Sequence, residues 1–138
     1  MDERYPIGAT GSVLVSVLRH DRSDTGYGRW SVALGLAGNE ATVHVPGHYA
    51  GVLAQRIREA DVRFAPGLRL ARDEYLDLTA LDRDGEQSLA LSSSARLPAR
   101  VTIEVPRDEL AGVAALLDQA QALIEELRKG LGLVPDFL

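Results

Sequence analysis

A loop between the first two predicted strands carries side chains suited to contacting unpaired bases. The loop spans positions 20–28 and contains Arg22 and Tyr27, and Arg29 follows it. Guanidinium groups contact phosphates, and a tyrosine ring offers a surface on which a base can stack, so this combination is typical of single-strand binding. An ordinary exposed hairpin is the alternative. In both cases we expect Trp30 to point into the core, because large and small side chains alternate after it.

Two further groups of residues could bind metal ions, but their spacing argues against it. His44 and His48 are four positions apart, yet Pro46 lies between them, so they cannot share one helix face. The acidic run 82–86 resembles the start of a calcium loop but lacks the later ligands of that pattern, which favours a solvated hairpin turn. The sequence therefore predicts no metal site.

Catalytic motifs are also missing from the sequence. The glycine-rich run 8–12 leads into a strand and not into a helix that could hold a phosphate, so a mobile N-terminal turn is expected there. There is no cysteine and no Gly-x-Ser-x-Gly motif, which removes thiol chemistry and the common serine nucleophile arrangement. We expect a non-catalytic protein without a cofactor.

Length and charge restrict the possible partners. The 138 residues suit a single domain, and the net charge of −5 provides no overall basic field for nucleic acid or an anionic membrane. The basic residues are fourteen arginines and one lysine. No run approaches the roughly 18 apolar residues of a membrane span, and the start of the chain does not resemble a secretory signal. We therefore expect a cytoplasmic protein without a membrane partner.

The most informative pattern is an internal repeat. The segment Thr42–Pro46 is echoed by Thr102–Pro106, and each copy is followed by an amphipathic segment rich in alanine and leucine. Such self-similarity is typical of a duplicated unit whose copies pack against each other. Within one domain, 1–138, the sequence predicts a first unit at 8–61, a second at 68–129 and an apolar tail at 130–138.

Each unit is predicted to contain three antiparallel strands followed by a helix, which gives an α+β fold with pseudo-two-fold symmetry. Alternating apolar residues predict the strands, at 12–19, 30–37 and 41–45 in the first unit and at 75–81, 88–92 and 100–105 in the second. The helices are expected at 47–60 and 107–129, the second ending at Gly130.

The last helix and the tail suggest self-association. Leucine, valine, isoleucine and alanine recur at heptad-like spacing from Leu110 to Leu127, which predicts a face that covers the sheet and partly meets another helix. The tail contains Leu131, Leu133, Val134, Phe137 and Leu138, which a small domain has difficulty covering alone. We expect a homodimer.

The order of elements resembles the PUR repeat of the Pur-alpha class, and Whirly single-strand binders have a related layout. The resemblance is clearest in the second unit, at 75–79, 84–86, 88–91 and 101–105, which look like successive strands and the turn of a PUR repeat. The segments 14–17, 29–32 and 42–45 take the corresponding places in the first unit. The resemblance implies paired curved sheets with helices crossing between them. It also implies single-stranded DNA or RNA binding on the sheet face away from the helices.

Seven residues are the candidate nucleic-acid contacts in this interpretation. They are Arg19, Arg22, Tyr27 and Arg29 in the first unit and Arg83, Arg96 and Arg100 in the second.

A protein–protein interaction module is the alternative. PUR repeats place basic and aromatic residues on the outer sheet face, whereas the positions here are small: Ser31, Ala33, Gly35, Ser88, Ala90 and Ser92. The surroundings of the arginines distinguish the two hypotheses. Arginines that share one open surface favour nucleic acid, and arginines that pair with neighbouring carboxylates favour a protein partner.

Overall fold

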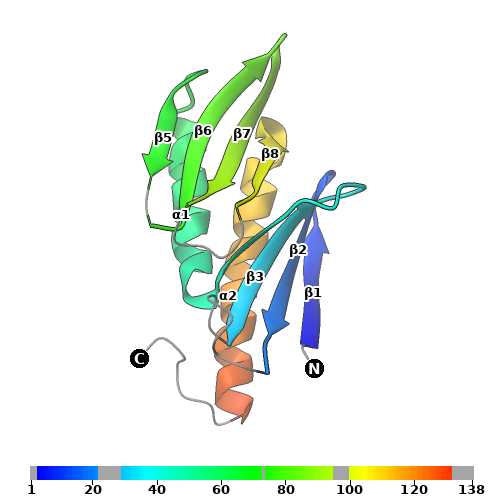
Figure 1. The fold of residues 1–138 in the computed structure, drawn as a ribbon. Helices are drawn as coiled ribbons and strands as arrows, with labels where there is room; N and C mark the ends of the chain where they lie inside the picture. The colour runs from blue at the N-terminus through cyan, green and yellow to red at the C-terminus, as the bar shows by residue number, and fades with distance from the viewer. Residues whose placement is uncertain (1–2, 22–28, 73, 95–99, 132–138) are drawn as a thin grey trace.

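The protein has an α+β fold, and its described residues form two four-stranded antiparallel sheets and two α-helices (Figure 1). It is seen here in a computed structural model that describes residues 3–21, 29–72, 74–94 and 100–131. The first sheet has the order β1-β2-β3-β4 and the second β5-β6-β7-β8, so each sheet is built from consecutive strands. In the first half these are β1 Glu3–Ala9, β2 Val13–Arg19, β3 Trp30–Leu36 and β4 Thr42–Pro46, followed by a 3-10 turn Gly47–Tyr49 and α1 Ala50–Val62. In the second half they are β5 Arg69–Arg72, β6 Leu76–Arg83, β7 Glu86–Ser93 and β8 Thr102–Pro106, followed by a 3-10 turn Arg107–Glu109 and α2 Leu110–Leu131.

Each half has one strand more than the sequence indicates. The extra strands are β1 and β5, and Gly8 lies within β1, so the expected mobile turn at 8–12 is wrong for its first residues. Each of these strands contains one bulged residue that has no partner in the neighbouring strand, which is Ile7 in β1 and Leu70 in β5. A bulge adds one residue and shifts the side-chain alternation, which hides such a strand from a search for period two.

The bulges occupy equivalent places, which relates the two halves residue by residue. Ser16 pairs with the residue before one bulge, and Thr79 pairs with the residue before the other. The helices also correspond, because their buried positions match at a constant separation of 60 residues. These positions are Ala50, Leu53, Ala54, Ile57 and Ala60 in α1 and Leu110, Val113, Ala114, Leu117 and Ala120 in α2.

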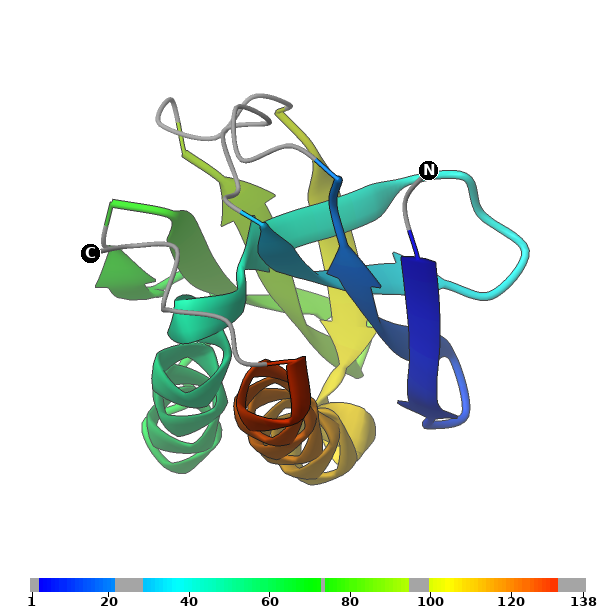
Figure 2. The ribbon, with the colours of Figure 1, turned by 90° about the horizontal axis from the view of Figure 1, so that it is seen from below.

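Each helix covers the sheet of the other half. Helix α2 packs on β1 and β2, whereas α1 contacts β5 and β6. Both helices lie side by side on the same side of the two sheets (Figure 2). Between the helices, the side-chain oxygen of Gln121 accepts a hydrogen bond from the backbone N–H of Gly51 at 2.5 Å, and Arg58 forms an ion pair with Asp118 at 2.6 Å. The two halves therefore share one core.

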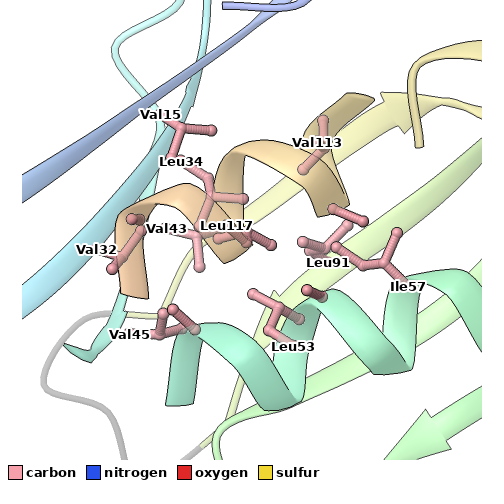
Figure 3. Packing of buried hydrophobic residues seen from close by; sticks show 14 of the residues in the cluster. Val15, Val32, Leu34, Val43, Val45, Leu53, Ile57, Leu91, Val113 and Leu117 are labelled. Atoms are coloured by element: carbon pink, nitrogen blue, oxygen red, sulfur yellow. The ribbon is translucent and has the colours of Figure 1, made fainter. Parts of the chain in front are cut away.

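That core lies between the sheets and the helix pair (Figure 3). Val15 and Leu34 of the first sheet, Leu91 of the second, and Leu53 and Leu117 of the helices are each at most 1% exposed. Burying a side chain of this size contributes roughly 1.5–3 kcal/mol. Trp30 is also buried, as the alternation predicts, with 1% of its surface exposed.

One predicted turn is confirmed, and one predicted helix end is wrong. The acidic run 82–86 forms a hairpin turn, with positive φ angles of 57° at Asp84 and 89° at Gly85, which suits a two-residue connection between β6 and β7. Gly130 does not end the last helix, because α2 continues to Leu131. Within the described ranges, no helix is long and apolar enough to cross a membrane.

Candidate functional site

Arg19 is engaged by neighbouring side chains. It ends β2, and its Nη1 lies 3.2 Å from the Oε1 of Glu3 in β1. Its guanidinium carbon lies 5.9 Å from the ring centroid of Trp30, the residue it pairs with across the sheet. The hydroxyl of Tyr5 also donates to Glu3 at 2.6 Å, and this hydrogen bond, with Arg19 nearby, lowers the pKa of Glu3 below its usual value. The charge of Arg19 is thus offset locally by a carboxylate.

Arg83 is paired in the same way in the second half. Its Nε and Nη2 lie 3.0 Å and 3.3 Å from the two carboxylate oxygens of Glu104 in β8. This two-point geometry matches a guanidinium fork to a carboxylate. Both side chains remain partly open to solvent, so the pair contributes little to stability, and the charge of Arg83 is offset by the carboxylate of Glu104.

The other candidates are distributed between two sheets. Arg29 precedes β3 at the same end of the first sheet as Arg19, and its carbonyl oxygen accepts a hydrogen bond from the backbone N–H of His20 at 2.7 Å. Arg100 is exposed and precedes β8, at the end of the second sheet opposite Arg83. Arg22, Tyr27 and Arg96 lie outside the described residues. Arg83 and Arg100 are therefore not brought together.

The sheet faces away from the helices are lined by small side chains. On the first sheet Ser31 and Ala33 are buried, with 0% and 3% of their surfaces exposed, and Leu14 is 49% exposed. On the second sheet Ala90 is buried, and the hydroxyls of Ser92 and Thr102 are 2.9 Å apart. None of these side chains can stack on a base or neutralise a phosphate.

His20 and His44 lie on the outer face of the first sheet. The Nε2 of His20 is 2.9 Å from the hydroxyl of Ser31, and both residues are buried. Burial lowers the pKa of His44, and the charges of His20 and Arg4 add to that effect. His48 lies in the 3-10 turn before α1, with its Nε2 3.4 Å from the hydroxyl of Tyr75. Among the described residues, no three His, Asp or Glu side chains are grouped to hold a metal ion.

The second half contains a cavity of about 860 Å³ where the β6–β7 hairpin, the end of β8 and the turn before α2 meet. The lining includes Arg83, Glu104 and Ser88 together with Glu86, Gln87, Arg107, Asp108 and Glu109. Sequence reasoning identified Arg83 but none of the last five as site residues. No motif marks them, because they come from two separate elements, β7 and the 3-10 turn before α2, that only the fold brings together.

Comparisons with known proteins supply no family. No family model matches the chain, and no curated protein matches its sequence. A solved structure described as "Mutations in SsgB correlate to longitudinal cell division during sporulation of Streptomyces coelicolor" aligns over 87% of this chain and 88% of that one. The sequences are 11% identical and the TM-score is 0.39, a superposition too loose to establish a common fold.

Proposed function

We propose that the chain is a non-catalytic module that binds another protein, acting in the cytoplasm. The observation that supports this most directly is the pairing of the arginines. Arg19 and Arg83 each face a carboxylate, which is the arrangement expected of structural charges and not of a phosphate-binding surface. The net charge of −5 also gives no long-range attraction for a polyanion.

The outer face of the first sheet is the proposed contact surface. Leu14 is 49% exposed on this face, whereas Ser16, Ser31 and Ala33 beside it are buried, so Leu14 is the side chain offered to a partner. An exposed apolar side chain of this size can pack against a partner. Nothing in this arrangement requires a charged or aromatic ligand.

The test compares two substitutions that introduce the same charge at different exposed apolar positions. Leu14→Glu changes the proposed surface, and Val62→Glu changes the end of α1, where Val62 is 86% exposed. Tagged wild-type protein, purified from its own cells and treated with nuclease, should retain a partner protein in a defined stoichiometry. We expect the Leu14 variant to lose that partner and the Val62 variant to keep it. Equal retention by both variants would remove the outer face from consideration.

Single-stranded nucleic acid binding is the second candidate, and the arrangement of the helices favours it. Two four-stranded sheets, each covered by the helix of the other half, support it, because the PUR and Whirly resemblance implies paired sheets with helices crossing from one to the other. In this proposal Arg22, Tyr27 and Arg29 contact the strand, together with Arg96 and Arg100.

A titration with short oligonucleotides distinguishes the two candidates. Fluorescence anisotropy at about 50 mM salt, where the electrostatic contribution is large, should show no binding if the protein-binding proposal is right. Salt-dependent binding would support nucleic acid instead. Arg29→Ala would then lower the salt slope by about 0.7, and Tyr27→Ala would weaken binding by about 1–3 kcal/mol.

A further inference from the structure

The two halves fill one equivalent corner of the fold in different ways. Ser31 pairs with Pro46 in the first sheet, and Ser88 pairs with Pro106 in the second, so these positions correspond. In each half, the corner is formed by the residue before the serine and the residue after the proline. It lies where the third strand of that half begins and the fourth strand ends. These residues are Trp30 and Gly47 in the first half and Gln87 and Arg107 in the second.

In the first half this corner is closed. Trp30 is 1% exposed, and Gly47 approaches it so closely that a Cβ atom at Gly47 would lie 3.0 Å from the Cβ of Trp30. His20 and Ser31 beside them are also buried and hydrogen-bonded to each other. The indole therefore fills this corner of the first half.

In the second half the same corner is open, and it is the cavity of about 860 Å³. Gln87 stands where the indole stands in the first half, and its Oε1 accepts a hydrogen bond from Nη1 of Arg107 at 2.7 Å. Arg107 is held on its other side by Asp61, with Nε 3.2 Å from Oδ1, and by the ring of Phe64, 4.3 Å from its guanidinium carbon. The wall of the cavity is therefore fixed by contacts to α1 and β7.

The charges of the cavity do not cancel. Arg83 is matched by Glu104 and Arg107 by Asp61. Three carboxylates have no cationic partner among the described residues. Glu86 and Asp108 have no hydrogen-bond or ion-pair partner there. Glu109 accepts hydrogen bonds only from uncharged groups, which are the hydroxyl of Thr10 and the N–H and hydroxyl of Ser12, the last two at 2.6 and 2.7 Å.

We propose that this cavity receives a basic side chain, arginine above all, from a peptide segment of the partner protein. Its volume lies within the roughly 300–1,000 Å³ typical of ligand pockets. A guanidinium offers five donors in a planar fork, which suits carboxylates that approach from different elements. The assignment rests on the proposed protein-binding function and adds to it a second contact, acidic and distinct from the outer face around Leu14.

The experiment uses the full chain and a fluorescein-labelled peptide of alternating arginine and glycine, titrated at low salt. Three variants accompany the wild type. Glu86→Gln/Asp108→Asn removes two charges from the cavity, and Glu125→Gln/Glu126→Gln removes two from exposed positions on α2. Ser88→Trp leaves every charge in place and puts an indole into the cavity, which Ser88 lines.

We expect the cavity charge variant and Ser88→Trp each to weaken peptide binding about tenfold, and the α2 variant to bind like wild type. Circular dichroism and thermal unfolding verify that the variants are folded. Equal weakening by both charge variants, or wild-type binding by folded Ser88→Trp, would overturn the assignment because the peptide would then sense only net charge. Spermine binding in the cavity without peptide binding would also overturn it, in favour of a free polyamine.

The experiments distinguish failure of the cavity assignment from failure of the protein-binding function. If the peptide does not bind but a partner is still lost on Leu14→Glu, the protein-binding proposal stands and the cavity assignment falls. If oligonucleotides bind and no partner is retained, the protein-binding function itself falls.

Discussion

The carboxylate of Glu109 accepts a hydrogen bond of 2.6 Å from the backbone N–H of Ser12, although 97 positions separate the two residues. Glu109 lies in the 3-10 turn that leads into α2, and Ser12 lies in the turn between β1 and β2. The hydroxyls of Thr10 and Ser12 donate to the same carboxylate. One side chain thus fastens the helix of the second half to the first sheet.

Replacing Glu109 with alanine should destabilise the protein, because three donors lose their acceptor at a partly buried place. We expect the free energy of unfolding to fall by about 1–3 kcal/mol. Urea denaturation followed by circular dichroism measures the change. Glu126→Ala, at an exposed position of α2, is the matched control and should change the free energy of unfolding by less than about 0.5 kcal/mol.

The contribution of Glu109 should disappear in acid. Desolvation acts to raise the pKa of Glu109, but hydrogen bonds from Thr10 and Ser12 outweigh it and lower the pKa below the usual 4.5. A carboxyl group with a depressed folded-state pKa stabilises the fold above its unfolded-state pKa and loses that contribution as the pH falls through the folded value. The stability difference between wild type and Glu109→Ala should therefore be constant near neutral pH and shrink below pH 4.5. A difference that persists undiminished at the lowest pH at which the fold survives would contradict this role.

His44 should produce a separate pH dependence closer to neutrality. Burial lowers its pKa below the usual 6.5, with the charges of His20 and Arg4 adding to the effect, so the folded state favours the neutral ring. The unfolded chain then binds more protons as the pH falls below 6.5, and stability decreases. His44→Gln should flatten the stability profile between neutrality and about pH 5, measured by denaturation at a series of pH values. An unchanged stability profile in His44→Gln would contradict this role.

Neither half should fold alone, because each sheet is covered by the helix of the other half. A fragment of residues 1–66 lacks α2, and a fragment of residues 67–138 lacks α1. Each leaves an apolar sheet face exposed, so we expect broad, non-cooperative thermal transitions for the separate fragments. Mixing them should restore one cooperative transition and a one-to-one complex by light scattering. Cooperative unfolding of either fragment as a monomer would show that the crossed packing is dispensable.

Truncation after Gly130 tests the expected homodimer. The removed segment holds Leu131, Leu133, Val134, Phe137 and Leu138, apolar residues that a small domain has difficulty covering alone. We expect wild type to be a dimer and the truncated protein to be a monomer or to aggregate, as judged by light scattering. An identical monomer mass before and after truncation would rule out this mode of assembly.

The sequence determined the duplication and the buried faces, because both are written in local periodicity. The echo of Thr42–Pro46 in Thr102–Pro106 marks two equivalent strands, and the heptad-like spacing in α2 correctly predicts buried Leu110, Val113 and Leu117. The alternation after Trp30 likewise predicts its burial. In each case the side-chain pattern of one element is enough, since the period of a strand or helix fixes which residues share a face.

Tertiary structure decided everything that depends on pairs of distant residues. The separation of equivalent positions changes along the chain, from 63 between Ser16 and Thr79 to 57 between Ser31 and Ser88, because the connections between strands differ in length. No single repeat period could therefore align the two halves or reveal β1 and β5.

The crossing of the helices, the pairing of Arg83 with Glu104 and the open corner beside Gln87 are likewise long-range. Each depends on which surfaces meet once the two halves share a core, and a local pattern carries no information about that choice. A residue type predicts which interactions a side chain can form. Whether an arginine is available to a ligand or is paired with a carboxylate depends on the neighbour that folding places beside it.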